Sequence, residues 1–381
     1  MKMLIVTKDT VLKGGTANSL LTILDNLPEE INDIYVLLPA RGPIQKILSD
    51  RKITVLFMNY ELAWTDKKGD FFYDLKKEWN NYRCAKKLAK MLVEKDIDIV
   101  YTNSGIVDVG AMASCMAGKR HIWHHREFIH YHFERKYILE WKERFLMQHS
   151  EKNISPSKAL LRELQKRYQI KNGVVLYNKF SRDKYYIENH SILKEEKIRC
   201  IVTGMMYEKK HQLDAVVAAC YAIKKYGISV ELLLVGNGTD AYVKLLKNRI
   251  HMLGIGEYVS IKGYISDITV LRKEYDVEIS CSQWESFGRN IIEAMLGGLL
   301  VIGANSGATK ELIKPYKNGL LYEAGNAEDL AKQLAWIWRD RKRSEKIAKS
   351  GQMWALNTML DDTYSEDLRK VFSENIDRSG A

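Results

Sequence analysis

The chain has 381 residues, an apolar fraction of 46% and a formal net charge of +11. A chain of this length exceeds what one hydrophobic core usually organises, so we expect two domains. The five cysteines are scattered and form no Cys-x-x-Cys pair, which is typical of reduced thiols in the cytoplasm and excludes a disulfide scaffold. No run approaches the roughly 20 apolar residues of a membrane-spanning helix, and the start of the chain has no signal-peptide pattern.

The first part of the chain alternates short apolar runs with helical patterns. Strands are expected at residues 3–6, 34–38, 53–58 and 97–102, and helices at 17–27, 44–49, 81–94 and 107–117. This alternation predicts a parallel, doubly wound sheet. Residues 60–75 are expected to be irregular, with aromatic side chains that pack in the core or contact an acceptor. Gly14 and Gly15 follow the first strand, where glycine lets the backbone approach a phosphate or a sugar.

The positive charge is concentrated in residues 119–190, which hold 16 Lys and Arg against 8 Asp and Glu. A localised basic face favours an anionic partner such as membrane lipid or a lipid pyrophosphate. Residues 131–147 are predicted to form one aromatic-rich basic helix, which either rests on a membrane, receives an acceptor or closes the domain with a solvated face. No nucleic-acid-binding motif accompanies the charge, so we expect no nucleic-acid partner.

Five histidines lie between residues 121 and 132, so a metal site has to be weighed. No cysteine is near them, and the acidic residues show no known ligand spacing, so we predict no metal. The charged residues 181–197 are expected to link the two domains.

The second half contains a second set of strands, each followed by a short polar or glycine-rich loop. Strands are expected at residues 198–203 and 230–235, followed by Gly204 and Gly236, and at 276–280. After the last of these, apolar residues from position 291 onward fall at helical spacing. Glu285 therefore lies on a loop at a strand's carboxyl end, and Glu293 lies two turns into a helix.

Ser286, Phe287 and Gly288 lie at or just before the start of this helix, where free backbone N–H groups favour an anionic or hydroxyl-rich ligand. The stretch from 281 to 300 resembles the Glu-x7-Glu motif of retaining glycosyltransferases with the GT-B fold. Glu285 and Glu293 match its two glutamates, and Gly288 matches its glycine.

Four other segments resemble the same family. They are the Gly-Gly loop at 14–15, Trp-His-x-Arg-Glu-Phe at 123–128, Gly-x5-Lys-x-Gln-x-Asp-Ala at 204–215 and the Gly-Asn-Gly at 236–238. His124 matches the family's active-site histidine, and Lys210 matches the lysine that binds the donor diphosphate. Met205 stands where many members carry an arginine, and Arg289 or Lys209 are candidates to compensate.

The resemblance implies an α/β fold with two Rossmann-like domains facing across a deep cleft. Residues 1–180 would form the acceptor side, with a C-terminal helix at 355–381 crossing back onto it, and residues 195–354 would bind the nucleotide sugar. His124, Glu285 and Lys210 would be catalytic. Further donor contacts would come from the other matched residues: Gly14, Gly15, Gly204, Gly236, Ser286, Phe287, Gly288, Arg289 and Glu293, with Glu293 on the ribose.

The function implied is transfer of a hexose, with retention and without metal or cofactor, from a nucleotide diphosphate sugar, a UDP-sugar by preference. The acceptor would be a glycan or a lipid-linked glycan in capsule, exopolysaccharide or O-antigen synthesis, which places the protein in the cytoplasm, peripheral at the inner face of the membrane. Alternatives are a nucleotide-sugar epimerase of the same fold and a non-catalytic partner protein. Two-carboxylate hydrolysis is disfavoured, because a loop glutamate and one within a helix serve different parts of one ligand.

Overall fold

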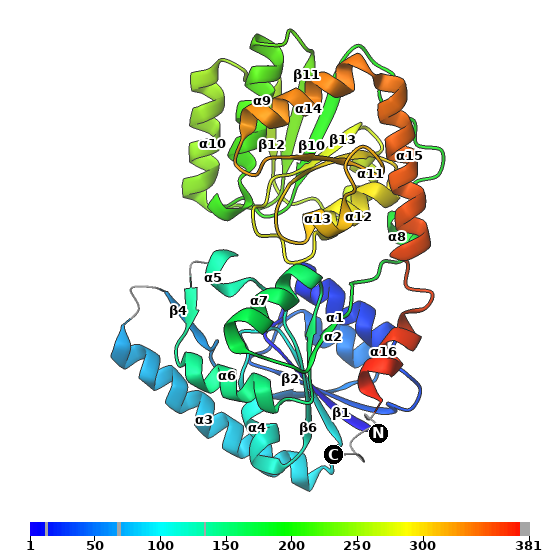
Figure 1. Ribbon diagram of the computed structural model, residues 1–381. Helices are drawn as coiled ribbons and strands as arrows, with labels where there is room; N and C mark the ends of the chain where they lie inside the picture. Colours follow the sequence, from blue (N-terminus) through cyan, green and yellow to red (C-terminus); the bar gives the residue numbers. More distant parts are fainter. Residues whose placement is uncertain (12–13, 67–69, 133–134, 374–381) are drawn as a thin grey trace. The chain divides into compact units, whose positions relative to one another are not determined.

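A computed structural model describes residues 1–11, 14–66, 70–132 and 135–373 (Figure 1). The chain forms two compact units, Met1–Lys179 with Asp361–Ala381, and Phe180–Leu360. Each unit is built on a parallel sheet with helices on both faces, so the predicted α/β class with two Rossmann-like domains is confirmed. No helix among the described residues is both long and apolar enough to cross a bilayer.

The first unit contains a seven-stranded sheet in the order β3-β2-β1-β5-β6-β8-β9. Its strands are β1 (Lys2–Thr7), β2 (Asp33–Leu38), β3 (Thr54–Phe57), β5 (Ile99–Asn103), β6 (Arg120–His124), β8 (Lys152–Ser155) and β9 (Gly173–Val175). One face packs against α1 (Gly15–Asp25), α2 (Ile44–Asp50) and α16 (Tyr364–Phe372). The other packs against α3 (Phe71–Glu94), α4 (Val109–Ala117), α6 (Glu140–His149) and α7 (Lys158–Tyr168). Two apolar layers therefore bury the sheet, as a parallel sheet requires.

The second unit contains a six-stranded sheet in the order β12-β11-β10-β13-β14-β15. Its strands are β10 (Ile198–Thr203), β11 (Val230–Val235), β12 (Val259–Lys262), β13 (Val277–Ser280), β14 (Leu300–Ala304) and β15 (Leu320–Tyr322). Its helices are α8 (Arg182–Tyr185), α9 (Gln212–Lys224), α10 (Asp240–Leu253), α11 (Ile268–Arg272), α12 (Arg289–Leu296), α13 (Thr309–Leu312), α14 (Ala327–Arg339) and α15 (Arg341–Thr358).

The strand order reverses once in each sheet, between β1 and β5 and between β10 and β13. At such a point the loops leaving the two strands diverge to opposite faces, and ligands of open α/β sheets bind beside them. The sequence-predicted loops after β1, β10 and β13 all leave the sheets there.

The prediction of one helix at residues 131–147 is wrong. The structure has a short helix α5 (Ile129–His132), then β7 (Arg135–Tyr137), and then α6. β7 pairs antiparallel with β4 (Trp64–Asp66), and the Tyr137 hydroxyl donates to the carbonyl of Gly105. Long-range strand pairing has overridden the local helical pattern.

The prediction that residues 60–75 are irregular is also wrong, since they contain β4 and the start of α3. The expected packing of aromatic residues in the core holds for Trp64 but not for the aromatic residues that begin α3. Helix α3 already begins at Phe71, because the Asp70 carboxylate caps it by accepting from the N–H groups of Phe72 and Tyr73. The side chains of Phe71 and Phe72 are 67% and 81% exposed. Because this cap was not recognised in the sequence, the helix was predicted to begin at residue 81, ten residues too late.

Residues 181–197, which were expected to link the two domains, belong instead to the second unit. They contain α8, and Leu193 is buried in the core of the second unit. Further along, the chain from 355 is not one helix: α15 ends at Thr358 and α16 begins at Tyr364, and residues 374–381 lie outside the described part.

Asp276 holds this segment to the second sheet. Its buried carboxylate accepts from the backbone N–H groups of Leu193 at 2.7 Å and Arg199 at 2.8 Å, and pairs with the Arg199 guanidinium. Asp276→Ala would leave two backbone N–H groups unpaired and would remove one of the two carboxylates, Asp276 and Glu195, that pair with Arg199. We expect it to lower the free energy of unfolding by about 3 kcal/mol, measured by urea denaturation, whereas Glu257→Ala at an exposed site should change it little. Equal stability of the two variants would show that the segment is not held in this way.

Candidate functional site

The glycines after β10 and β11 are required by the backbone itself. Gly204 has φ +133° and Gly236 has φ +148°, and a Cβ added to Gly236 would lie 2.0 Å from the carbonyl oxygen of Gly204. Only glycine allows these two loops to touch. The contact sets the path of the chain toward Lys210, which ends the short 3₁₀ turn η1 (Glu208–Lys210).

Lys210 and Glu285 form an ion pair in this structure, with Nζ 2.7 Å from Oε2. Both side chains are largely buried, so solvent screens the pair less than it would at the surface. The backbone of Glu285 is held by the 306–308 turn: the N–H of Ala308 donates to its carbonyl, and a Cβ on Gly307 would overlap its backbone. The loop after β13 is therefore fixed, and its glutamate faces a cation across the switch point.

Glu293 on α12 is held between two arginines. Arg272 Nη1 lies 3.2 Å from one carboxylate oxygen, and Arg289 Nη2 lies 3.3 Å from the other. The Arg289 guanidinium also lies over the Phe180 ring at 4.5 Å and donates to the Tyr185 hydroxyl. The described contacts of Arg289 therefore orient the Glu293 carboxylate.

Sequence reasoning missed Arg272 and its partners. Arg272 is 1% exposed and pairs with Glu278, which is fully buried on β13 and is also bonded by Thr203. The signal was available, since a charged residue within an otherwise apolar strand needs a buried partner of opposite charge. Through Arg272, this buried network fixes the position of the Glu293 carboxylate.

The remaining predicted residues of the second unit lie around α12. Gly288 has φ +93° at the N-cap, and Phe287 is buried and stacks on Phe180 with ring centroids 6.2 Å apart. Ser286 is half-buried beside them. Met205, which stands in place of the family's arginine, is 62% exposed. The structure therefore brings Lys210, Glu285 and the start of α12 to one sheet edge.

The first unit carries the other predicted residues. Gly14 has φ +119° and caps α1, whose first residue is Gly15; Lys13 lies outside the described residues. His124 ends β6 and is fully buried, with Nδ1 2.6 Å from the Tyr101 hydroxyl, while no described group is bonded to its Nε2.

Three histidines of β6 and the following loop are buried and neutral. Burial lowers the pKa of His121 to about 3, that of His125 to about 4, and that of His124 well below its usual value. His121 is bonded to Thr102 and Ser150, and His125 to Asn153. His121 is bonded through both ring nitrogens, whereas His124 and His125 are each bonded through one. Among the described residues, no histidine belongs to a group of side chains that could hold a metal ion.

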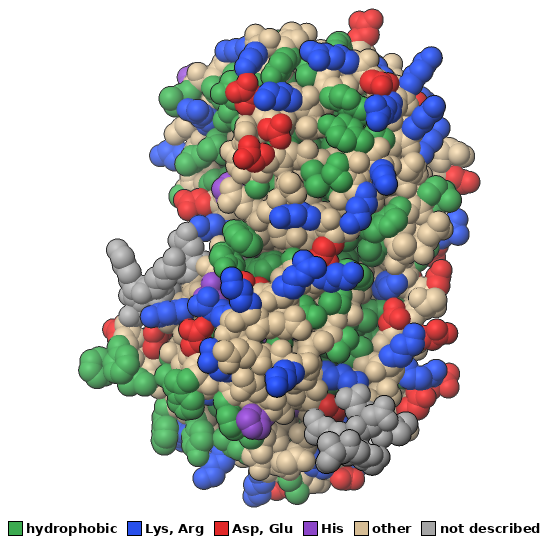
Figure 2. All heavy atoms as spheres, viewed as in Figure 1, with side chains coloured by type: hydrophobic (Ala, Val, Ile, Leu, Met, Phe, Trp, Pro, Cys, Tyr) green, Lys and Arg blue, Asp and Glu red, His purple; other side chains and the backbone are tan. Residues whose placement is uncertain are grey.

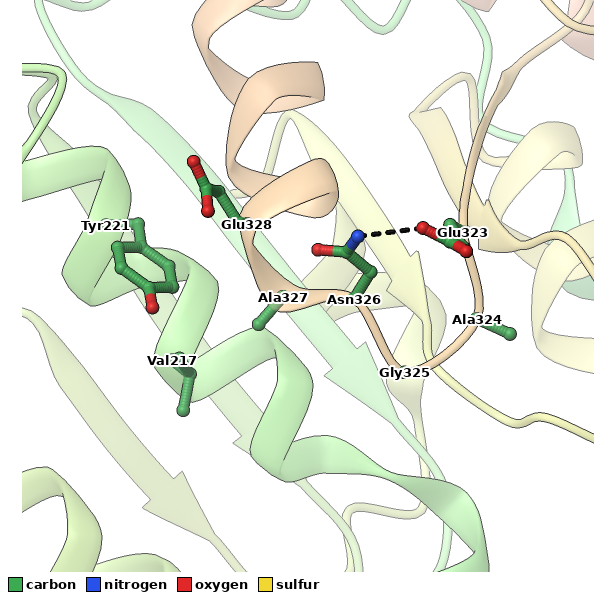
Figure 3. Close-up of a pocket in the computed structure, with 8 residues that line it drawn as sticks. All are labelled: Val217, Tyr221, Glu323, Ala324, Gly325, Asn326, Ala327 and Glu328. Atoms are coloured by element: carbon green, nitrogen blue, oxygen red, sulfur yellow. Dashed lines mark hydrogen bonds between the residues drawn. The ribbon is translucent and has the colours of Figure 1, made fainter.

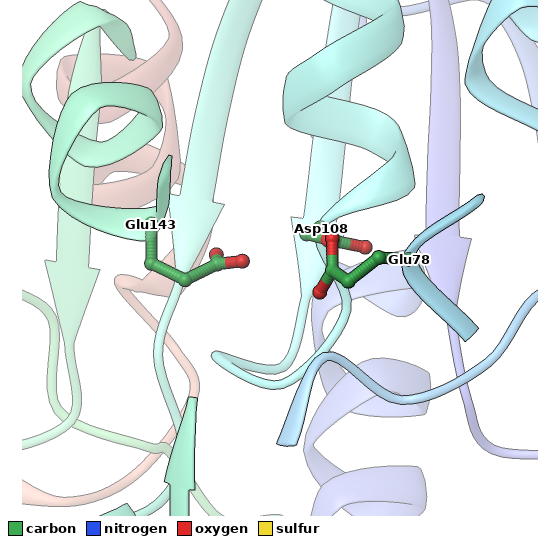
Figure 4. A group of neighbouring side chains, drawn as sticks. All are labelled: Glu78, Asp108 and Glu143. Atoms are coloured by element: carbon green, nitrogen blue, oxygen red, sulfur yellow. The ribbon is translucent and has the colours of Figure 1, made fainter. Parts of the chain in front are cut away.

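Within the described part of the chain, one group of acidic residues is close enough together to hold a metal ion: Glu78, Asp108 and Glu143 (Figure 4). The ammonium of Lys142 lies among them, in contact with Glu78, 2.5 Å from Asp108 and 3.1 Å from Glu143. Burial raises the pKa of Glu143 well above its usual value, and the three carboxyls raise that of Lys142. A buried cation of the chain itself supplies the charge at this place.

A shallow depression of 460 Å³ lies elsewhere, between α9 and the loop before α14 (Figure 3). Val217, Tyr221 and residues 323–328 line it. It contains none of the predicted site residues and no buried charged side chain. The β10–β13 edge has both, and we therefore take it as the candidate site.

Comparisons with known proteins identify the family. Residues 185–354 match the family Glycosyl transferases group 1, and residues 13–179 match Glycosyltransferase Family 4. Among curated proteins, the putative glycosyltransferase EpsD of Bacillus subtilis is 23% identical over 190 residues, covering 50% of this chain and 49% of that protein. N-acetyl-alpha-D-glucosaminyl L-malate synthase of Bacillus anthracis is 27% identical over 203 residues, covering 48% and 51%. The chain thus spans about half the length of the curated relatives it matches.

Solved structures resemble nearly the whole chain. Anabaena HepE in complex with UDP-glucose has a TM-score of 0.77 and 22% identity, covering 97% of this chain and 99% of that one. Sucrose-phosphate synthase from Thermosynechococcus elongatus has a TM-score of 0.77 and 14% identity, covering 97% and 98%. At identities this low, the structural similarity establishes the fold alone.

The buried histidines predict a pH dependence. Below pH 6.5 the unfolded chain binds protons that these folded side chains do not, so their contribution to stability falls as pH falls toward their folded pKa values. His121→Asn should destabilise the protein at pH 7.5 by breaking two hydrogen bonds. The free energy of unfolding lost through this substitution should be about 2 kcal/mol smaller at pH 5 than at pH 7.5, measured by urea unfolding at both pH values. A penalty independent of pH would mean that His121 is not buried as a neutral ring.

Proposed function

The chain belongs to the glycosyltransferases of the GT-B fold, and on that premise we propose that it transfers a sugar from a nucleotide diphosphate sugar to an acceptor hydroxyl with retention at the anomeric carbon. The observation that carries the proposal is the charge pattern at the β10–β13 edge. One ammonium and two carboxylates lie there, each held by the buried structure beneath it. A diphosphate, a sugar and a ribose offer the complementary groups.

Lys210 is the group that offsets the diphosphate charge. Its present partner is Glu285, so a diphosphate entering the site takes the ammonium and releases the glutamate toward the sugar hydroxyls. Charge-assisted bonds to phosphate are strong, and stabilising the leaving diphosphate lowers the barrier to breaking the anomeric bond. We propose that the departing phosphate, and not Glu285, assists attack by the acceptor on the same face.

Glu293 is the group that accepts from the ribose hydroxyls. Arg272 and Arg289 each contact one of its carboxylate oxygens and fix its orientation. Phe287 and Gly288 would present backbone N–H groups to the sugar at the start of α12. No step of this scheme uses a metal ion or a cofactor. His124 is the first unit's candidate for the sugar pocket.

The donor is proposed to be a UDP-sugar. Solved structures of the similar HepE contain UDP and UDP-glucose, which supports UDP as the first nucleotide to test. An epimerase remains the second candidate, because it would bind the same donor. It would turn over donor without an acceptor and would not produce a glycoside of retained configuration, so NMR of the product separates the two activities.

The acceptor is proposed to be a glycan or lipid-linked glycan, reached at an anionic membrane. Several cations of residues 119–190 are internal, among them Arg126, Lys142 and Lys152. Several exposed aromatic residues lie instead along α3 and on α6, and Figure 2 shows hydrophobic side chains gathered over the start of α3. The α3 stripe comprises Phe71, Phe72, Leu75, Trp79 and Tyr82, with exposed basic residues at 76, 83, 86, 87 and 90. Exposed aromatic residues beside basic ones favour an interfacial membrane surface.

Two variants test the proposed diphosphate contact and the proposed ribose contact separately. Lys210→Met should weaken UDP binding about tenfold or more but should affect UMP less, because the second phosphate carries the contact. Glu293→Gln should weaken UDP and UMP by similar factors, because both carry the ribose. Isothermal titration calorimetry on the full chain measures both, with Glu328→Gln in the depression of Figure 3 as the control. Unchanged binding by both site variants, or weaker binding by the control, would place the nucleotide elsewhere.

The membrane proposal has its own test. The wild type should sediment with vesicles of anionic lipid at low salt, and Phe72→Ser with Trp79→Ser should reduce the bound fraction several-fold because the inserted apolar surface is lost. Met252→Ser is the matched control, since Met252 is 74% exposed on α10 of the other unit. Absence of wild-type sedimentation, or equal sedimentation of all three proteins, would contradict the proposal.

A further inference from the structure

Three polar residues form a row at the carboxyl edge of the first sheet. Thr7 of β1 is in register with Asn103 of β5, and Asn103 is in register with His124 of β6. Residues in register on neighbouring parallel strands point to the same face. This is the face covered by α1, because Tyr101, two residues before Asn103, packs in the core that includes Leu20 of α1.

Arg126 follows β6 and joins this row. Its Nε donates to the Asn103 side-chain oxygen at 3.0 Å, and its Nη1 donates to that of Asn178 at 2.8 Å. Arg126 is 7% exposed. Both partners are neutral amides, and within the described residues no carboxylate forms an ion pair with this guanidinium.

Asp9 and Glu127 act on Lys8 together with Arg126, and both carboxylates are bonded to other groups. Asp9 accepts from Lys8 and from the Thr7 hydroxyl, and Glu127 accepts from the Ser104 hydroxyl and the Gly105 N–H. A buried cation without a contacting counter-charge costs several kcal/mol. The chain therefore keeps at Arg126 a charge that an anion would stabilise.

Three nitrogens of this cluster are buried without a hydrogen-bond partner among the described residues: Arg126 Nη2, Asn103 Nδ2 and His124 Nε2. The first two are donors. Burial raises the pKa of Tyr101 to about 12, so its hydroxyl keeps its proton and can donate it to His124 Nδ1. The neutral ring of His124 then carries its own proton on Nε2, which makes the third nitrogen a donor as well.

We propose that Arg126, Asn103 and His124 form an oxyanion-binding site in the first unit, which takes a phosphate or carboxylate group of a substrate. The fork of a guanidinium beside two neutral N–H donors suits the oxygens of such a group. The anion site rests on the contacts of Arg126 and on the buried donors without a described partner. Its assignment to a substrate rests on the proposed transfer reaction, where the group is either the donor's diphosphate or an acid group of the acceptor.

Inorganic phosphate is the first probe, added to the full chain in a thermal unfolding assay at constant ionic strength. Phosphate should raise the wild-type midpoint in a concentration-dependent way by mass action, and Arg126→Gln should abolish the rise. Arg120→Gln is the matched control, because Arg120 begins the same strand but is paired with Glu151 at 2.7 Å. A rise in Arg126→Gln equal to that of the wild type would overturn the site, as would no rise in the wild type.

If Arg126→Gln does not fold, Arg126→Lys keeps the charge and loses the fork. It should then respond to phosphate with an affinity reduced roughly tenfold, and an unreduced affinity would overturn the proposal.

UDP distinguishes the two sources of the anion. If the group is the donor's diphosphate, Arg126→Gln should bind UDP at least tenfold more weakly, and saturating UDP should remove the phosphate response of the wild type. If it belongs to the acceptor, UDP affinity should be unchanged and the phosphate response should persist at saturating UDP. A phosphate response that depends on Arg126 in a protein that binds no nucleotide would retain the anion site while rejecting the proposed function.

Discussion

The ion pair between Lys210 and Glu285 is the interaction on which the second unit's site depends. Two opposite charges are held 2.7 Å apart at the carboxyl edge of the sheet, in a largely buried place. Each has a partner that a ligand can replace. A diphosphate competes for the ammonium and hydroxyl groups compete for the carboxylate, so neither charge is left unpaired before a ligand binds.

The rigid part of the site lies beneath this pair. Arg272 and Glu278 are buried and paired with each other, and Arg272 also holds Glu293 from the core side. The glycine contacts at 204, 236 and 307 fix the loops from the backbone side. A preformed arrangement of this kind reduces the conformational entropy lost when a ligand binds. The first unit uses the same edge of its own sheet, where Arg126 is bonded only to neutral groups.

Much of this could be predicted from the sequence, because the signals were local. The βα alternation gave the class of fold, and the positions of Glu285 on a loop and Glu293 on a helix followed from apolar spacing. The failures were of two kinds. Arg135–Tyr137 forms a strand only because β4 lies beside it, and the cap at Asp70 was overlooked among aromatic residues expected to be buried. Glu278 in an apolar strand indicates a buried cation nearby. No local pattern identifies that cation as Arg272, because its contacts are with β13 and α12.

The measurement that tests the central claim most directly is a crystal structure of the full chain with UDP bound. The account predicts the second phosphate within hydrogen-bonding distance of Lys210 Nζ, the ribose hydroxyls on Glu293, and Glu285 separated from Lys210. A nucleotide bound away from the β10–β13 edge, with the Lys210–Glu285 pair intact, would contradict it.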